Sequence, residues 1–204
     1  AQVLLTQADL DARRNYLNVR NTLTTLFKMK NVIPVINEND STATEELRFG
    51  DNDTLAAKIA AKISADLLII LTDVDGLYDR NPDRDKNARL IPEVAEITHD
   101  LEAVAGGAGS IASTGGMRTK LAAARIATAA GVRCVIANGF RAGIIHGVIG
   151  AAAPCTQFQP AHSVLSHRKR WIAFGRSTRG IVRIDDGARA ALIDRGKSLL
   201  PAGV

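Results

Sequence analysis

The sequence has few of the residues that build metal centres, disulfide frameworks and membrane spans. It holds two cysteines and four histidines, and neither set has the spacing of a zinc site. No apolar run approaches the roughly 20 residues that cross a bilayer. The longest, Leu67 to Leu71, has the length of a strand. No basic segment followed by an apolar one opens the chain, so no secretory signal is predicted. We therefore expect a cytoplasmic protein with two reduced thiols.

Aromatic residues are also scarce, at 4% of the chain. This argues against a single-strand nucleic-acid binder that stacks bases on aromatic side chains. The net charge of +5 permits an anionic partner such as a nucleotide or RNA without selecting one. Much of the basic excess follows Ser166, where Arg168 to Arg170 precede Trp171. One interpretation is an RNA-binding tail. The simpler one is a solvated basic linker beside one buried tryptophan, and the low aromatic content favours it.

Strand-like and helix-like segments alternate through the first 140 or so residues. Strands are predicted at 3–6, 32–36, 67–71 and 132–137, and helices at 9–30, 51–64 and 114–130. Pro34 suggests that its strand lies at an edge or begins there. Gly131 stands where a helix commonly ends. This alternation predicts an α/β fold, a three-layer αβα sandwich with a mostly parallel sheet.

A change of composition marks a predicted domain boundary. Between Gly150 and Ser166 the chain is dominated by Ala, Pro, Gln and Ser. Strand-like runs near Trp171 and Ile181 follow, then a short helix at about 187–195. The chain ends before this second part has the size of a domain. We expect residues 1–158 to form the main domain, 159–170 a linker and 171–204 the start of a small β-rich domain.

Four polar segments lie where predicted strands end or helices begin, which is where open parallel sheets bind ligands. They are Asn37–Asp40, Gly50–Asp53, Thr72–Tyr78 and Ser113–Lys120. Neither common phosphate-loop motif is present. In the first segment, Asp40 suits an ammonium group and Asn37 a carboxylate. In the last, two glycines and a helix start offer backbone N–H groups to phosphate. Taken singly, these segments also fit a polar loop, competing N-caps, an Asp-Gly turn and a glycine-rich linker.

Taken together and in order, the segments resemble the amino acid kinase family, over a stretch from about Val3 to the end. The matching stretches are Val35–Asp40, Gly50–Asp53, Leu71–Asp73 with Asp75–Tyr78, Thr114–Lys120 and Arg168–Ile172. The asparagine-rich loop followed by Asp-Asn-Asp resembles the branch acting on glutamate rather than aspartate, acetylglutamate, carbamate or uridylate. The resemblance implies ATP-dependent phosphorylation of the side-chain carboxylate of L-glutamate to glutamyl 5-phosphate, in proline biosynthesis. Mg²⁺ would accompany ATP.

The same resemblance implies roles for individual residues. Lys120 would stabilise charge on the transferring phosphoryl group, and Asp53 would hold catalytic lysines in place. Asp40 and Asn52 would contact glutamate, with Asn37 beside them. The nucleotide would be contacted by Thr72, Asp73, Thr114, Gly115, Gly116, Met117, Arg118, Thr119 and Lys120. Ala112-Ser113 departs from the glycine that the family often has before Thr-Gly-Gly, and this predicts a slightly stiffer loop.

The resemblance also implies what this chain lacks. The family's first strand supplies a phosphate-binding lysine, a serine loop contacts glutamate, and a PUA domain follows the kinase domain. The first two are absent here and the third is only begun at 171–204, so the chain alone is expected to be inactive. Family members commonly self-associate, and proline is a candidate feedback inhibitor. Three alternatives stay open: another small-molecule kinase of this fold, an RNA-binding role for the tail, and a non-catalytic regulator.

Overall fold

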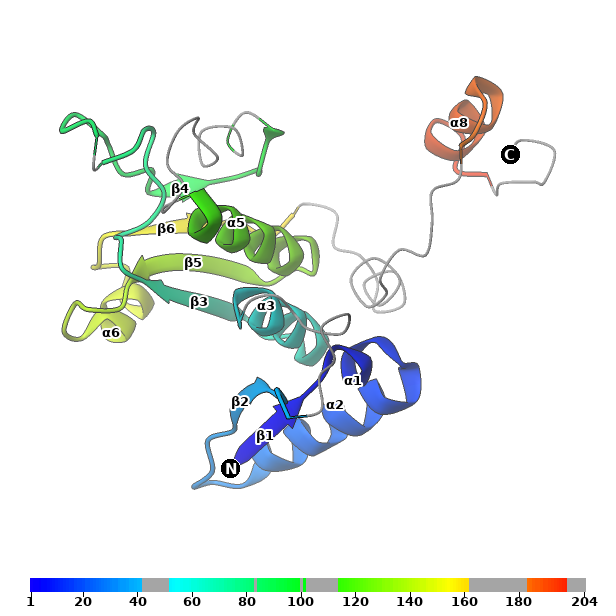
Figure 1. Cartoon of the computed structure of the whole chain (residues 1–204), viewed down its shortest axis with the longest axis horizontal. Helices are drawn as coiled ribbons and strands as arrows, with labels where there is room; N and C mark the ends of the chain where they lie inside the picture. The colour runs from blue at the N-terminus through cyan, green and yellow to red at the C-terminus, as the bar shows by residue number, and fades with distance from the viewer. Residues whose placement is uncertain (42–51, 83, 100, 102–113, 162–182, 198–204) are drawn as a thin grey trace.

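The computed structural model describes residues 1–41, 52–82, 84–99, 101, 114–161 and 183–197 (Figure 1). Within them, the strands are β1 (Gln2–Leu5), β2 (Val35–Glu38), β3 (Leu67–Thr72), β4 (Glu93–Val94), β5 (Arg133–Asn138) and β6 (Cys155–Phe158). The helices are α1 (Gln7–Asp11), α2 (Arg13–Lys28), α3 (Asn52–Ile63), α5 (Thr114–Ala129), α6 (Ile144–Ile149) and α8 (Asp186–Ile193). β1 and β2 form a parallel pair, and the other four strands form a sheet in the order β3-β5-β6-β4.

The four-stranded sheet is mixed but mostly parallel, as predicted. β3 and β5 pair in parallel, from Leu67 opposite Arg133 to Thr72 opposite Asn138. β6 is antiparallel to β5 and parallel to β4. The β6 strand lies where the sequence predicted only a change of composition. Residues just beyond it still belong to the sheet region, since the Gln159 amide donates to the Val94 carbonyl at 3.0 Å.

Helices cover both faces of this sheet, which confirms the predicted three layers. The runs Leu67–Leu71 of β3 and Cys134–Ala137 of β5 are apolar, the pattern of strands that are buried on both sides. On one face Leu68, Ile70, Cys134 and Ile136 pack with alanines of α3 and α5. On the other, Val135 and Ala137 pack against α6 (Figure 1). The fully buried Phe158 of β6 completes the first core.

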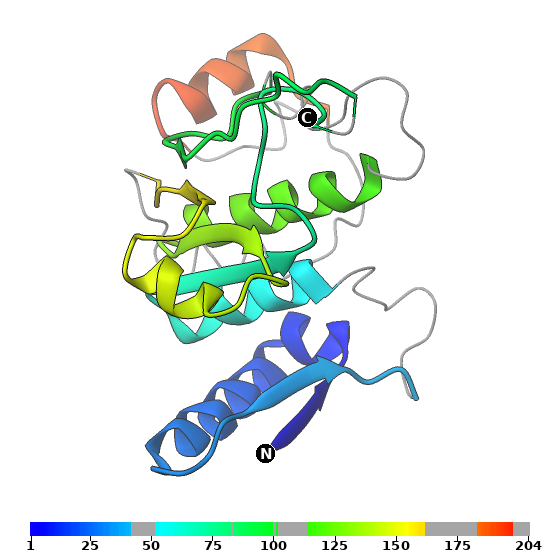
Figure 2. The ribbon, with the colours of Figure 1, turned by 90° about the vertical axis from the view of Figure 1, so that its left-hand side faces the viewer.

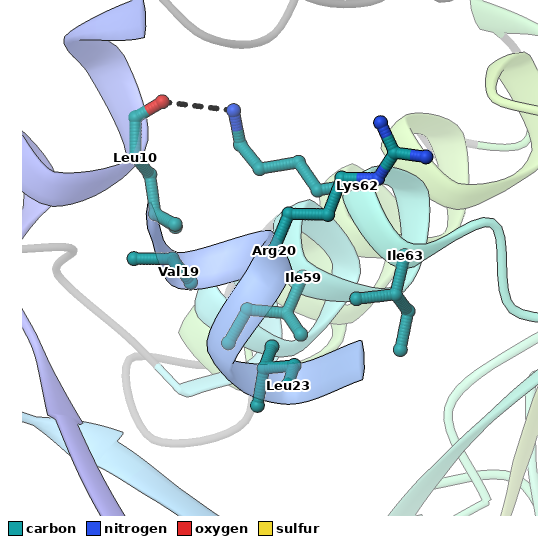
Figure 3. Close-up of a pocket in the computed structure, with 7 residues that line it drawn as sticks. All are labelled: Leu10, Val19, Arg20, Leu23, Ile59, Lys62 and Ile63. Carbon is teal, nitrogen blue, oxygen red and sulfur yellow. Dashed lines mark hydrogen bonds between the residues drawn. The ribbon is translucent and has the colours of Figure 1, made fainter. Parts of the chain in front are cut away.

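α3 also packs against the unit formed by β1, α1, α2 and β2. Leu55 and Ile59 of α3 share a second core with three buried leucines of that unit, Leu5, Leu10 and Leu23. In two views at right angles this unit lies beside α3 (Figures 1 and 2). The Lys62 ammonium at the end of α3 donates to the Leu10 carbonyl at 2.8 Å (Figure 3). One helix therefore carries contacts to both strand systems.

The predicted helix at 9–30 is in fact two helices. Thr6 caps α1 with a capping box, in which Asp9 accepts hydrogen bonds from the Thr6 backbone N–H and hydroxyl. Ala12 then adopts an extended conformation between α1 and α2. β2 likewise begins at Val35 rather than Val32, since Pro34 precedes the strand. The predicted helix end at Gly131 is confirmed, because this residue has a φ of +84°.

Little of the predicted small domain is described. Within 183–197, α8 lies close to the predicted short helix, and the Asp185 carboxylate accepts from the Ala188 N–H at 2.6 Å as its N-cap. The tail from 171 to 182 and from 198 to 204 lies outside the described residues, as does the segment 42–51. Across the described helices, none has both the length and the apolarity to cross a membrane.

Candidate active site

Two neighbouring helices bring an acidic and a basic side chain together. Asp53 lies in the first turn of α3, and Lys120 lies in the second turn of α5. The Lys120 Nζ is 3.0 Å from the Asp53 Oδ2, and the two side chains are 15% and 21% exposed. The Thr119 hydroxyl lies 3.5 Å from the same carboxylate oxygen. Small alanines between the helices permit this approach.

The position of this pair follows from the connections. Each helix is joined by a short turn to the strand that follows it, α3 to β3 and α5 to β5. Each helix packs on its sheet and reverses direction into its strand, so its N-terminus lies near the strand's carboxyl end. The Asp53–Lys120 pair therefore lies at the edge where parallel sheets bind ligands.

The start of α5 is open on the side of Gly116. Apart from the backbone of the helix itself, no heavy atom of the described residues lies within 4 Å of the place where a Cβ would stand on this residue. Free N–H groups in the first turn of a helix attract anions, so the open turn suits a phosphate. The Thr119 hydroxyl donates to the Gly116 carbonyl at 2.9 Å. The side chain of Thr114 and the surroundings of Gly115 lie outside the described part.

Two residues predicted to contact nucleotide differ in what they can offer. Arg118 is exposed on α5, whereas Met117 is half-buried and packs against the main core. The Met117 side chain therefore serves the fold, and its backbone is what remains for a ligand. The ammonium group of Lys120, also predicted to contact nucleotide, has three N–H donors. Its contact with the Asp53 carboxylate uses one of them.

The carboxyl end of β3 carries Thr72 and Asp73. The Thr72 hydroxyl donates to the Asp73 Oδ1 at 3.0 Å. The adjacent end of β5 holds the backbone beneath them: the Gly139 N–H donates to the Thr72 carbonyl at 2.8 Å, and the Asn138 amide to the Asp73 carbonyl at 3.3 Å. Sequence reasoning missed Asn138 and Gly139, although an Asn-Gly pair directly after a parallel strand was an available signal.

The loop after Asp73 is bound to its surroundings on both sides. The Arg141 guanidinium donates two hydrogen bonds to Asp75, at 2.7 and 2.6 Å. Hydrogen bonding by Arg141 is the main reason that the pKa of Asp75 is lowered. Burial and, secondarily, the Asp75 charge raise the pKa of Tyr78. Farther on, the buried Thr156 hydroxyl of β6 accepts from the Leu77 N–H at 2.8 Å. No sequence motif indicates the roles of Arg141 and Thr156.

The residues expected to contact glutamate are divided between the β1–β2 strand pair and the start of α3. Asn37 is exposed on β2, and Asp40 is exposed two residues after the strand ends. The Asn39 N–H donates to the Leu5 carbonyl at 2.8 Å, so the backbone stays paired past the end of β2. Asn52 is exposed at the start of α3, directly before Asp53. α3 thus links the two parts, and their convergence on one ligand stays a prediction.

The two cysteine thiols are buried near this site without taking part in it. Burial and, secondarily, the Asp53 charge raise the pKa of Cys134 to about 12, and burial raises that of Cys155. Because the thiolate is the reactive form, a thiol reagent at pH 8 should label neither cysteine in the folded protein and both in urea. Absorbance or mass spectrometry of labelled protein measures this. Rapid labelling of Cys134 without denaturant would contradict the burial described here.

Comparison with known proteins identifies the family. A model described as the amino acid kinase family matches residues 1–138. The chain belongs to the amino acid kinase family. It is 50% identical over 204 residues to a glutamate 5-kinase of Moorella thermoacetica and 49% identical over 203 residues to that of Syntrophotalea carbinolica. Both alignments cover 100% of this chain and 54% of the relative. The chain thus spans about half the length of these curated relatives.

Two solved kinase structures resemble the fold of this chain. An isopentenyl phosphate kinase of T. acidophilum in a product complex aligns with a TM-score of 0.52 at 18% identity, covering 78% of this chain and 59% of its own. A Giardia lamblia carbamate kinase bound to AMP-PNP aligns at 0.50 and 17% identity, covering 71% and 48%. At such identities the likeness concerns the fold alone, and it confirms the predicted fold class.

Proposed function

We propose that the protein transfers the γ-phosphoryl group of MgATP to the side-chain carboxylate of L-glutamate, yielding glutamyl 5-phosphate and ADP in the first step of proline biosynthesis. The observation that carries this proposal is the Asp53–Lys120 contact at the N-terminal ends of two adjacent helices. Its support from outside the structure is the 50% identity to a protein named glutamate 5-kinase.

The chemistry requires little from the protein beyond position and charge. A carboxyl group with a pKa near 4 is ionised at pH 7, so the nucleophile needs no general base. A glutamate side-chain oxygen attacks the γ-phosphorus, the bond to the β–γ bridging oxygen breaks, and ADP leaves. Catalysis of such a step rests on alignment of the reactants and neutralisation of phosphoryl charge.

The described residues divide this work between them. Lys120 stabilises the charge of the transferring group, and Asp53 holds the ammonium in place across the two helices. The open first turn of α5 receives phosphate oxygens through its N–H groups. Thr72 and Asp73, beside the end of β5, contact the nucleoside part. Glutamate is bound by three side chains. The Asp40 carboxylate pairs with its ammonium, and the amides of Asn37 and Asn52 donate to its carboxylate.

Magnesium enters this scheme as part of the MgATP substrate. Among the residues described, no cluster of three or more His, Cys, Asp or Glu side chains could hold a metal ion. Mg²⁺ bound mainly by phosphate oxygens and water needs few protein ligands. This is the arrangement we propose.

The assignment of Asp40 predicts a selective effect on glutamate. In the complete gene product, Asp40→Ala should raise the KM for glutamate by about tenfold or more, since a charge-assisted hydrogen bond contributes roughly 1.5–3 kcal/mol. The KM for ATP should stay unchanged in steady-state kinetics. Asp66→Ala is the matched control. This exposed carboxylate precedes the first residue of β3, at the end of the strand away from the proposed ligand site. A rise confined to the KM for ATP would show that the pockets are assigned wrongly.

A substrate panel tests the proposed reaction itself. ADP release and trapping of the acyl phosphate with hydroxylamine are measured with glutamate, aspartate and N-acetylglutamate. A site that pairs the α-ammonium should reject the acetylated substrate strongly. Turnover of N-acetylglutamate or of aspartate in preference to glutamate would assign the protein to another activity of this fold.

Further properties implied by the resemblance are also proposals. They are a cytoplasmic location, a homo-oligomeric state, inhibition by proline, and a PUA domain that begins near residue 171. The one described element of that last region is α8. Salt-dependent RNA binding by the complete gene product would favour a nucleic-acid role for this tail.

A further inference from the structure

The loops that leave β3 and β5 are joined by a polar bridge. The two strands run parallel with Thr72 opposite Asn138, so both loops start side by side. Backbone and amide contacts join the first residues, as described above. Three residues farther along each loop, the Arg141 guanidinium donates to the Asp75 carboxylate. The bridge thus extends from the predicted nucleotide residues to the turn that precedes α6.

The Arg141–Asp75 pair differs from an ordinary surface ion pair. Both hydrogen bonds of a planar fork are formed, which fixes orientation as well as distance. The Asp75 side chain is 18% exposed, and the two residues are 66 positions apart in sequence. The Arg80–Asp85 pair on the same loop has one contact of 3.1 Å, a 37% exposed carboxylate and a separation of five positions. The Arg141–Asp75 pair joins the loop after β3 to the loop after β5, whereas the Arg80–Asp85 pair lies within one loop.

The segment between Thr72 and Leu77 is therefore held at both ends. At its far end, the Leu77 N–H donates to the buried Thr156 hydroxyl, and Gly76 packs directly on Thr156. At its start, Asn138 and Gly139 hold the backbone of Asp73 and Thr72. Between the two ends, the Asp75 side chain is held by Arg141. Loss of the Arg141 contact would remove this middle attachment of the segment. The apolar core beneath makes no use of the Arg141 side chain, which is 49% exposed.

We propose that Arg141 is a positioning residue for the nucleotide: through Asp75 it holds the backbone that follows Thr72 and Asp73 in the conformation that binds ATP. The inference rests on the proposed function, because it takes the end of β3 as part of the nucleotide site. It adds a residue outside the motifs by which the nucleotide site was predicted. Arg141 acts through Asp75 and need not touch the nucleotide itself.

The test compares Arg141→Gln with Arg80→Gln in the complete gene product. Arg141→Gln should weaken binding of a non-hydrolysable MgATP analogue about tenfold by calorimetry, equivalent to roughly 1.4 kcal/mol. The KM for ATP should rise in parallel, while the KM for glutamate and the melting temperature stay near the wild-type values. Arg80→Gln removes a cation of similar exposure from the loop that carries Asp75 and should change none of these. Arg141→Lys, which keeps charge but loses the fork, should be intermediate.

Coupling with the partner gives a second readout. Asp75→Asn alone should weaken analogue binding as Arg141→Gln does, and the double variant should lose little more, since the residues act as one unit. Should Arg141→Gln fail to fold, Arg141→Lys and Asp75→Asn carry the test.

Unchanged analogue affinity in these variants would overturn the proposal, as would an equal loss in Arg80→Gln. If analogue binding depends on Arg141 but the protein does not phosphorylate glutamate, the role of Arg141 is supported and the proposed substrate is wrong. If the protein phosphorylates glutamate but Arg141→Gln leaves the KM for ATP unchanged, the substrate is supported and the role of Arg141 is wrong.

Discussion

Replacement of Lys120 by alanine in the complete gene product is expected to lower kcat by about 10²-fold or more. Loss of one preorganised donor to developing charge typically has an effect of this order. The lysine is held at 3.0 Å from Asp53 and is only partly exposed, so its charge is poorly screened by water. The KM values for ATP and glutamate should change far less than kcat. Single-turnover phosphoryl transfer measures the chemical step directly.

The control for this variant is Lys86→Ala, which removes an exposed lysine from the loop after β3. It should leave kcat within about twofold of the wild-type value, as expected for a surface charge that is largely screened. A wild-type kcat in Lys120→Ala would refute the role assigned to this residue. Equal losses in both variants would point to net charge rather than to a positioned ammonium.

Gly76→Ala is expected to destabilise the folded protein by about 2–3 kcal/mol, the upper part of the range for overpacking. A Cβ at this position would clash with the Thr156 hydroxyl and lie 2.8 Å from its backbone nitrogen. Since Thr156 lies in the central part of the sheet, relief must come from movement of the loop. That movement would also strain the bond between the Leu77 N–H and the Thr156 hydroxyl. Urea unfolding followed by circular dichroism measures the change.

Gly116→Ala is the matched control for stability, because a methyl group at this helix position meets no atom within 4 Å. Alanine is the better helix former, so the variant should unfold at the same or a slightly higher urea concentration. Equal stability of Gly76→Ala and the wild type would contradict the packing of the loop on β6.

The elements that could be predicted from sequence are those with long, unambiguous patterns. The apolar runs of β3 and β5, each joined to an alanine-rich helix, specify a parallel layered sheet before any coordinates are seen. The elements that were missed have short or weak patterns. β6 has four residues within an alanine- and proline-rich stretch, and its antiparallel pairing with β5 depends on a long-range contact. The break at Ala12 follows a helix of only five residues that begins at the Thr6 N-cap, too short for a periodic pattern to show.

The candidate site divides in the same way. The family resemblance implied that Asp53 holds catalytic lysines, and the structure has its carboxylate 3.0 Å from the Lys120 ammonium. The packing of α3 on α5 produces this contact, and no local sequence pattern alone reveals it. Arg141 and Thr156 were missed for a related reason. Their partners lie 66 and 79 positions away in sequence, and neither residue stands in a recognisable motif. Such positioning contacts become visible only when the strands have been placed side by side.

The proposed reaction requires that glutamate and the triphosphate share one crevice between α3, α5 and the strand ends. A crystal structure of the complete gene product with L-glutamate and a non-hydrolysable MgATP analogue tests this directly. We predict Lys120 Nζ at about 3 Å from a γ-phosphate oxygen and the Asp40 carboxylate at about 3 Å from the glutamate ammonium. The glutamate side-chain oxygen should lie roughly 3–3.5 Å from the γ-phosphorus. Glutamate bound on a surface away from Asn52, or phosphates out of reach of Lys120, would contradict it.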